Sequence, residues 1–166
     1  MIAAPLPADE QQRLAALRAL LILDTPPEQR FDRIVAFAAT EFDMPVVTIS
    51  LVDADRQWFK SRLGLPQCET PRRASFCAHA ILQAGVFVVE DARLDARFAD
   101  SPLVTGTPPM RFYAGAPLQL PDGSRVGMLC LIDTRPRQLD DCDLAILGAL
   151  RDLVVEELLA GVPASA

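Results

Sequence analysis

The chain has 166 residues, of which 51% are hydrophobic and 23% are charged. This length and apolar content fit a single domain with its own core, since domains commonly run about 100 to 150 residues. We therefore expect one domain over residues 1–166, with a core from about residue 9 to residue 160. The formal net charge of −6 excludes a general nucleic-acid binder, which needs a basic face to displace counterions from phosphate.

The cysteines and the N-terminus bear on compartment and metal content. Cys68, Cys77, Cys130 and Cys142 stand at spacings that match no paired metal-knuckle pattern. The N-terminus lacks the basic region, apolar stretch and cleavage site of a secretory signal. No run approaches the roughly 18 apolar residues that a membrane span requires. We expect a cytoplasmic protein with reduced thiols, no metal site and no direct membrane insertion.

Helical periodicity marks the N-terminal quarter of the chain. A first helix, capped near Asp9, extends to Leu23 and must stop before Pro26. Thr25 and Glu28 then have the spacing of a capping box, with proline at the first helical position. A second helix is expected to follow, with an apolar face formed by Phe31, Ile34, Val35, Ala38 and Phe42.

From Pro45 the apolar period changes from helical spacing to two, as in a strand. Val47, Ile49 and Leu51 form a fully apolar face, whereas Thr48 and Ser50 place two hydroxyls on the other. A turn at residues 53–55 leads to a second strand over 56–63, which predicts a hairpin.

The middle of the chain alternates irregular segments with short elements. Residues 64–73 show no periodicity. Ser75 is expected to cap a short helix through Gln83, with Gly85 as its left-handed terminator. A third strand is expected over 86–90, followed by a long irregular connection over 91–109 of the kind that is usually functional or mobile, such as a lid.

Two strands and a helix complete the chain. Strands over 111–120 and 125–133 are joined at Pro121-Asp122-Gly123, where proline fixes one dihedral and glycine permits a positive one. Asp140 or Asp141 is expected to cap a final helix through Leu159. Helices at both ends of a run of antiparallel strands predict an α+β layer structure. The apolar stripes of the terminal helices are broad, which favours a homodimer formed through them.

Five segments, in this order, carry a resemblance to a known family: ILDTPPEQRFDRI (22–34), ISLVDADRQWFKSRLGL (49–65), ETPRRASFCAHAI (69–81), VVEDARLDARFAD (88–100) and RFYAGAPLQLPDGSRVGMLCLID (111–133). The chain resembles the GAF domain family, and particularly the version found in bacterial histidine kinases and diguanylate cyclases. The resemblance implies an antiparallel sheet of five or six strands, N- and C-terminal helices on one face, and a small-molecule pocket on the other beneath the short helix and the loop.

The resemblance also implies a function. GAF modules of this kind are non-catalytic sensor domains that bind a small molecule and relay its presence to an output partner or domain. The implied outputs are a histidine kinase of a two-component system or a diguanylate cyclase in cyclic-di-GMP signalling. Any enzymatic activity is then expected in such an attached domain, and no residue of this chain is expected to be catalytic.

Candidate ligand-binding residues come from the strands and the short helix. Cys77 and His79 are two apart on a helix and point to nearly opposite sides, so they do not ligate one metal together. Phe76 shares the face of His79, which suits a planar ligand and equally suits packing. Small residues after Tyr113 leave volume for a cavity, and two arginines can anchor an anion. The predicted set is Thr48, Ser50, Arg73, Phe76, Cys77, His79, Arg111, Tyr113 and Ala114.

Several alternatives stay open from the residues alone. Cys77 fits a small buried hydrophobe, a pocket-lining residue, or a redox-sensitive thiol whose pKa is lowered by Arg72 or Arg73. Family members that attach a linear tetrapyrrole have histidine directly after the cysteine, whereas this chain has Cys77-Ala78-His79. We expect no covalent chromophore, and the ligand or cofactor is unknown. The competing functions are a thiol-dependent redox enzyme using Cys77 and a ligand-free dimerisation scaffold.

Overall fold

The computed structural model describes residues 1–162 of the protein. In chain order its elements are α1 (Glu10–Ala19), α2 (Gln29–Glu41), β1 (Val46–Val52), β2 (Arg56–Leu63), β3 (Glu69–Pro71), the 3-10 turn η1 (Arg72–Ala74), α3 (Cys77–Ala80), β4 (Phe87–Val89), the 3-10 turn η2 (Ala92–Leu94), α4 (Pro102–Thr105), β5 (Phe112–Gln119), β6 (Arg125–Asp133) and α5 (Asp141–Ala160). No helix within residues 1–162 combines the length and the apolar composition of a membrane span.

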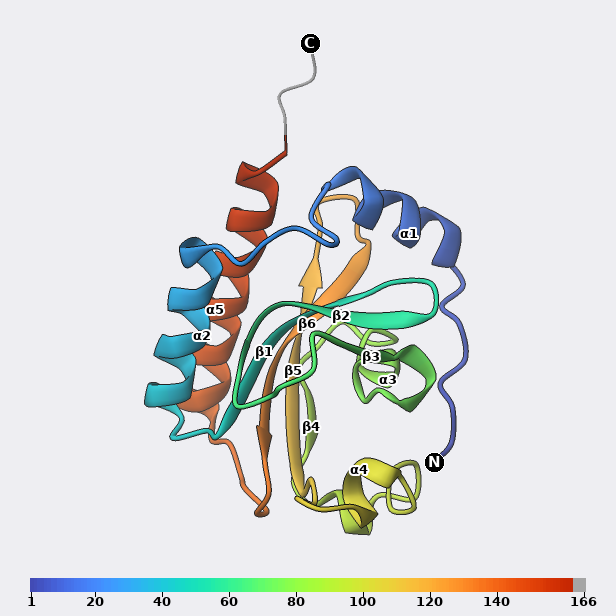
Figure 1. Ribbon diagram of the computed structural model, residues 1–166, viewed down its shortest axis with the longest axis vertical. Coiled ribbons are helices and arrows are strands. Elements are labelled where there is room, and N and C mark those ends of the chain that lie inside the picture. The colour runs from blue at the N-terminus through green and yellow to red at the C-terminus, as the bar shows by residue number, and fades with distance from the viewer. Residues whose placement is uncertain (163–166) are drawn as a thin grey trace.

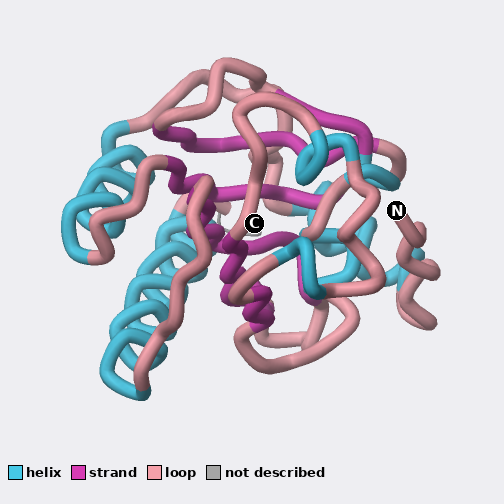
Figure 2. Tube along the Cα trace, turned by 90° about the horizontal axis from the view of Figure 1, so that it is seen from below, coloured by secondary structure: helices cyan, strands magenta, loops and turns pink. Residues whose placement is uncertain are grey.

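The six strands form one antiparallel sheet in the order β3-β2-β1-β6-β5-β4. Helices α2 and α5 lie side by side along one face of this sheet (Figure 1). Figure 2 shows the same two helices on one side of the strands and the short helices and loops on the other. We call the second layer, made of η1, α3, η2 and α4, the cap. The α+β fold predicted from the sequence is confirmed.

Both faces of the sheet are buried, so alternate strand residues enter two different cores. The helix-side core takes Val47, Ile49 and Leu51 of β1, and packs them against the apolar faces of α2 and α5. The cap-side core lies on the opposite face and contains Phe76, Cys77, Ile81, Phe98, Val104, Tyr113, Met128 and Cys130. The two hydroxyls of β1, on Thr48 and Ser50, are buried on this second face.

Helix α5 has the N-terminal cap predicted from the sequence. Asp140 accepts a hydrogen bond from the backbone N–H of Asp143 at 2.7 Å, and the Asp143 carboxylate accepts one from the N–H of Asp140 at 3.1 Å. This capping box satisfies amide groups that the first turn of α5 cannot pair internally. The turn before β6 is also as predicted, since Gly123 has a positive φ of 91°.

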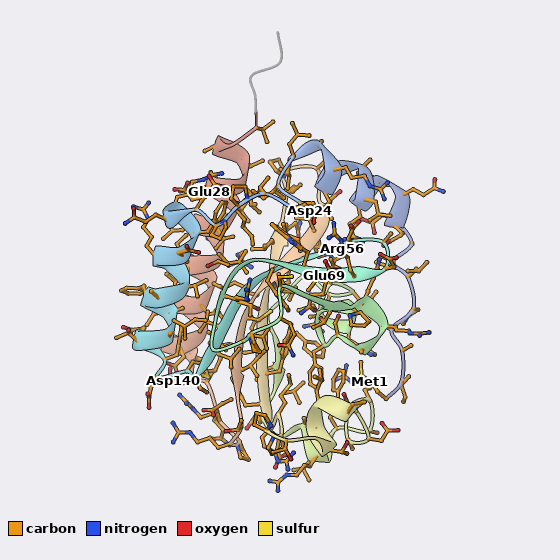
Figure 3. The ribbon with its side chains drawn as sticks, in the orientation of Figure 1. Met1, Asp24, Glu28, Arg56, Glu69 and Asp140 are labelled. Atoms are coloured by element: carbon orange, nitrogen blue, oxygen red, sulfur yellow. The ribbon has the colours of Figure 1, made fainter. Side chains whose placement is uncertain are left out.

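The predicted capping box of α2 is wrong. Glu28, and not Thr25, occupies the N-cap position, and the helix begins at Gln29. The Thr25 hydroxyl donates to the Ile22 carbonyl at 2.5 Å and accepts from the Lys60 ammonium at 2.8 Å. The Lys60 ammonium also forms an ion pair with the Glu28 carboxylate at 2.7 Å. Both residues of the expected capping box therefore bind Lys60 of β2 instead of each other's backbone; Glu28 is labelled in Figure 3.

Three further boundaries differ from the sequence-based expectation. Helix α1 ends at Ala19, short of Leu23, because Leu21 adopts the left-handed conformation with a φ of 54°. The short helix spans Cys77–Ala80 only, and Gly85 does not adopt a positive φ. The Ser75 hydroxyl does accept from the Ala78 N–H at 3.0 Å, as a cap should. Strand β3 was not expected, because residues 64–73 show no periodicity; it is formed by pairing with β2.

Helix α1 lies apart from the pair of α2 and α5 (Figure 1). Arg13, which is 1% exposed, donates to the carbonyl of Val52 at the end of β1 across 2.6 Å. Leu17 is fully buried and extends the helix-side core toward this end of the sheet. The helices that share one face of the sheet, as expected, are α2 and α5 (Figure 1). Helix α1 is instead bound to the end of β1 through Arg13.

Candidate ligand-binding site

A cavity of about 70 Å³ lies between the sheet and the cap. Strands β1, β2, β5 and β6 form its floor, and α3 together with the segment before β5 forms its roof. Sites for drug-sized ligands measure roughly 300 to 1000 Å³, so this cavity admits only a much smaller molecule. The lining residues are Thr48, Gln57, Phe59, Leu65, Thr70, Ser75, Phe76, Cys77, Leu103, Met110, Tyr113, Cys130 and Ile132.

A few polar groups lie at the floor of the cavity. The hydroxyls of Thr48 and Ser50 lie 2.9 Å apart, and Ser50 Oγ lies 3.6 Å from the sulfur of Cys130. Gln57 enters from β2 with a side chain that is 9% exposed. Its oxygen Oε1 is buried and has no hydrogen-bond partner within residues 1–162. A buried carbonyl oxygen normally has a partner, which singles out this atom in the wall of the cavity.

Two thiols and a phenol meet beside these hydroxyls. Cys77 Sγ lies 3.0 Å from the hydroxyl of Tyr113 and 3.4 Å from Cys130 Sγ, and the Tyr113 hydroxyl lies 3.4 Å from Cys130 Sγ. All three side chains are 1% exposed or less. Gly115 makes this arrangement possible, because a Cβ at that position would lie 2.6 Å from the Tyr113 hydroxyl. We call these three residues the thiol cluster.

The groups of the thiol cluster do not ionise alike. Burial raises the pKa of Cys77 and that of Tyr113 well above their ordinary values. Burial also opposes ionisation of Cys130, but hydrogen bonds from Cys77, Tyr113, Ser50 and Thr48 outweigh it and lower its pKa to about 7. The hydrogen bonds thus favour the thiolate of Cys130, whereas burial disfavours that of Cys77.

The hypothesis that Arg72 or Arg73 lowers the pKa of Cys77 is wrong. Burial is the main influence on the Cys77 thiol, and it raises the pKa. Arg72 donates instead to the Glu10 carboxylate at 2.5 Å and to the Asp53 carbonyl at 3.0 Å. Arg73 lines a separate surface depression that also includes Leu6, and it does not line the cavity.

Four of the predicted residues, Thr48, Phe76, Cys77 and Tyr113, line the cavity, and Ser50 lies just beneath it. Ala114 does not belong with them. It pairs with Leu131 in the sheet and packs into the helix-side core, because neighbouring strand residues point to opposite faces. Ala114 therefore does not line this cavity.

His79 and Arg111 are engaged elsewhere. His79 Nε2 lies 2.7 Å from the carbonyl oxygen of Ile2, and its ring meets Phe98 edge-on with centroids 4.9 Å apart. Burial lowers the pKa of His79. The Arg111 guanidinium donates to the carbonyls of Val104 and Met110 at 2.8 and 3.2 Å, so it holds the segment before β5 in place.

Sequence reasoning missed Gln57 and Cys130. Cys130 had a usable signal, because Met128, Cys130 and Ile132 alternate in β6 with Leu129 and Leu131 of the helix-side core. Gln57 had none, since a single glutamine near the start of a strand is ordinary in sequence. Its importance comes from burial, which only the tertiary structure reveals.

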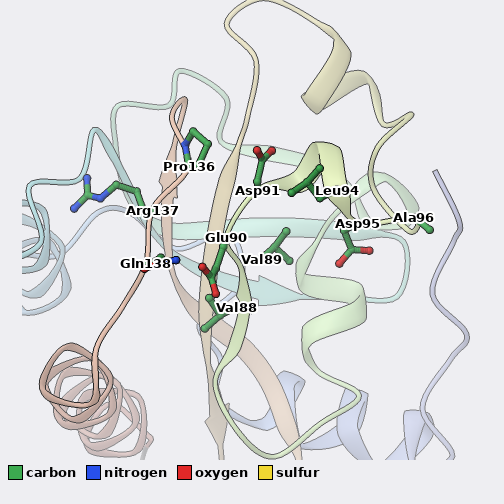
Figure 4. Close-up of a pocket in the computed structure, with 10 residues that line it drawn as sticks. All are labelled: Val88, Val89, Glu90, Asp91, Leu94, Asp95, Ala96, Pro136, Arg137 and Gln138. Atoms are coloured by element: carbon green, nitrogen blue, oxygen red, sulfur yellow. The ribbon is translucent and has the colours of Figure 1, made fainter.

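A larger hollow lies at the edge of the sheet beside β4 (Figure 4). It is an open groove of about 1100 Å³ lined by Val88, Val89, Glu90, Asp91, Leu94, Asp95, Ala96, Pro136, Arg137 and Gln138. None of the nine residues predicted from the sequence lines it. Arg137 is already bound to the carbonyl of Asp43 and the carboxylate of Asp133, each at 2.9 Å. The convergence of buried polar groups favours the smaller cavity as the site.

Comparison with known families settles the classification. The model of the GAF domain family matches residues 26–158, which include every strand and all of α2. The chain belongs to the GAF domain family. This GAF domain is 45% identical over 159 residues to a cyclic di-GMP phosphodiesterase from Pseudomonas aeruginosa; the match covers 95% of the chain and 27% of that protein. The chain thus spans about a quarter of the length of that relative.

Solved structures share the fold of this GAF domain. The GAF domain of a phosphoenolpyruvate-protein phosphotransferase from Acinetobacter has a TM-score of 0.67 at 15% identity, covering 97% of this chain and 99% of that one. A free methionine-R-sulfoxide reductase from Neisseria meningitidis, in complex with its substrate, has a TM-score of 0.64 at 20% identity, covering 97% and 98%. A GAF domain of a phosphotransferase and a reductase thus share this fold.

Proposed function

We propose that this GAF domain is a non-catalytic sensor that binds a small molecule in the cavity between sheet and cap. The observation that carries the proposal is the buried Gln57 oxygen, which has no donor among the described residues. Leaving such an acceptor unpaired costs about 1 to 3 kcal/mol. A ligand that donates a hydrogen bond to Gln57 and fits the apolar wall of Phe59 and Phe76 removes this cost.

The size of the cavity limits how the ligand binds. A drug-sized ligand occupies roughly 300 to 1000 Å³, well above the 70 Å³ present here. A ligand larger than a few heavy atoms therefore requires the cap to move away from the sheet. Such a movement supplies the two states that a sensor needs, since a ligand shifts an equilibrium only when it binds the states unequally.

We propose that cap movement reaches the output through the terminal helices. Arg72 lies in η1, directly before α3, and is bound to Glu10 of α1. The relative in Pseudomonas aeruginosa supports an output in cyclic-di-GMP turnover, and the resemblance to modules of diguanylate cyclases and histidine kinases points to the same class of signalling protein. We place the protein in the cytoplasm on the same grounds.

We also propose that the domain works as a homodimer. Phe37 on α2 and Leu153 and Leu159 on α5 are 53%, 46% and 39% exposed, although each helix also buries four apolar residues against the sheet. Apolar side chains left on the outer surface of two adjacent helices are typical of a helical interface.

Native mass spectrometry tests the sensor proposal. We expect freshly purified protein to carry a small mass that is lost on denaturation. Gln57→Leu removes the acceptor and should abolish this mass, whereas Gln119→Leu makes the same change at an exposed position of β5 and should retain it. Protein that never carries a ligand, and whose melting temperature no small molecule shifts, would favour the ligand-free dimerisation scaffold instead.

A thiol-dependent enzyme is the second candidate, and the thiol cluster is the observation that favours it. The reductase from Neisseria meningitidis suggests the substrate to try, free methionine-R-sulfoxide. The chain is incubated with this substrate and dithiothreitol, and methionine is measured. Turnover that Cys130→Ala abolishes would replace the sensor proposal, and conversion no faster than with dithiothreitol alone removes the candidate.

A further inference from the structure

We propose that Cys77 and Cys130 form an oxidisable pair, which a hydroperoxide entering the cavity converts into a disulfide between α3 and β6. The pair is a modification site in its own right, whether or not the cavity also holds a signalling ligand. The proposal therefore goes beyond the sensor function and can fail independently of it.

The distance between the two thiols suits a disulfide. The two sulfurs are 3.4 Å apart, against about 2.05 Å in a disulfide, so they must approach by about 1.4 Å. Cys130 lies in β6, which is paired with a strand on each side and cannot shift easily. Cys77 begins a helix of four residues within the cap, so the movement falls to α3. The bond would draw α3 toward the sheet.

The cavity can bring a small oxidant to the two thiols. Both cysteines are buried, but both line the cavity. Hydrogen peroxide has one heavy atom more than water, and the cavity of about 70 Å³ is several times the roughly 10 to 15 Å³ of cavity space that one water molecule needs. The hydroxyl groups of Thr48 and Tyr113 at the cavity wall supply polar partners for it. Larger oxidants do not fit without movement of the cap.

The chemistry assigns a separate role to each thiol. Cys130, with the lower pKa, acts as a thiolate; its sulfur attacks one peroxide oxygen, and the O–O bond breaks. The departing oxygen takes a proton and leaves as water, or as an alcohol from an organic hydroperoxide, and Cys130 becomes a sulfenic acid. The Cys77 sulfur then attacks the Cys130 sulfur, the S–O bond breaks, and the hydroxide leaves as water with the Cys77 proton. Two thiols are oxidised and one peroxide is reduced.

The other two cysteines differ from this pair in their exposure to solvent. Cys68 and Cys142 are exposed, so their oxidation links separate molecules or adds oxygen to single thiols. The double variant Cys68→Ser/Cys142→Ser removes these reactions at surface positions and leaves the buried pair as the only thiols of the chain. This variant is the background for the test.

In the experiment, the folded double variant is treated with hydrogen peroxide, quenched with catalase, denatured in iodoacetamide and weighed intact. We expect a species that takes up no alkyl group, has lost two hydrogens, and regains two alkylation sites after reduction. Peptide mapping should join Cys77 to Cys130. The same treatment of the variant in urea should form this bond more slowly, because the fold no longer holds the sulfurs together.

Two results would overturn the proposal: recovery of both thiols after peroxide treatment of the folded protein, or oxygen addition without the cross-link. A further change, Cys77→Ala in the same background, separates the two steps. It should block the disulfide and leave a Cys130 sulfenic acid that dimedone captures. Circular dichroism confirms that this variant is folded, and the double variant alone decides the outcome if it is not.

Discussion

Arg72, in the turn before α3, donates to the carboxylate of Glu10 on α1 across 2.5 Å. The same carboxylate accepts two hydrogen bonds from Arg13 at 2.9 Å, and Arg13 in turn binds the Val52 carbonyl at the end of β1. One carboxylate thus joins α1, the sheet and the cap. The two arginine side chains are only 1% and 7% exposed, so they depend on it for charge compensation.

Glu10→Gln should be strongly destabilising. Removing one partner of a buried ion pair leaves an uncompensated charge and costs about 3 to 5 kcal/mol. Urea unfolding followed by circular dichroism measures the change. Glu41→Gln, at an exposed position of α2, is the control and should alter the free energy of unfolding by less than about 0.5 kcal/mol. Equal effects of the two changes would contradict the role of Glu10.

Glu10 should also make the stability of the fold sensitive to acid. Burial opposes ionisation of Glu10, but hydrogen bonds from Arg13 and Arg72 outweigh it and lower its pKa to about 2. A carboxyl group with a lowered folded pKa stabilises the protein above its unfolded pKa of about 4.5 and loses this contribution as the pH falls through about 2. Acid unfolding curves of the wild type and Glu10→Gln should therefore converge toward pH 2. A constant difference would refute this assignment.

Gln57→Leu should stabilise the ligand-free protein by about 1 kcal/mol, because it replaces an acceptor that has no donor within residues 1–162 by an apolar group of similar size. Thermal unfolding of protein shown by mass spectrometry to carry no ligand checks this. Gln119→Leu, which is exposed, should leave the stability nearly unchanged. Destabilisation by Gln57→Leu would mean that the amide has a partner in solution.

His79 should make the folded state weaker as the pH falls toward about 5. Burial is the main cause of its lowered pKa, with a further contribution from the charge of Arg97, while Ile2 and Asp95 oppose the shift. The unfolded chain therefore binds more protons, and stability is lost as the pH falls below the unfolded pKa of about 6.5. His79→Gln keeps a donor for the Ile2 carbonyl and removes the titration. Its stability should vary less between about pH 5 and pH 6.5.

Phe37→Glu and Leu153→Glu should convert the proposed homodimer into a monomer without unfolding it, since both side chains are already about half exposed. Light scattering at tens of micromolar protein measures the mass. Leu94→Glu places the same charge on a leucine that is 85% exposed in η2, away from the helix layer, and should leave the dimer intact. A wild-type protein of monomer mass would remove the proposal.

The parts of the fold with strong local signals were predictable. The alternation in β1, the turn at Gly123 and the cap of α5 each depend on residues close together in sequence, and all three were confirmed. Strand β3 and the engagement of Thr25 by Lys60 depend on pairing with β2, which no local pattern encodes. For the same reason the sequence anticipated Thr48, Phe76, Cys77 and Tyr113 of the cavity lining, whereas Gln57 and Cys130 join them only through tertiary packing.

The two-core sheet also shapes how such a domain can change over evolutionary time. In β1, Thr48 and Ser50 contribute to the cavity, whereas Val47, Ile49 and Leu51 hold the helices. Substitutions that alter what the cavity accepts therefore fall at every second position and leave the intervening residues untouched. One strand carries two separate sets of positions, so ligand preference can diversify while the scaffold that presents the helices stays constant.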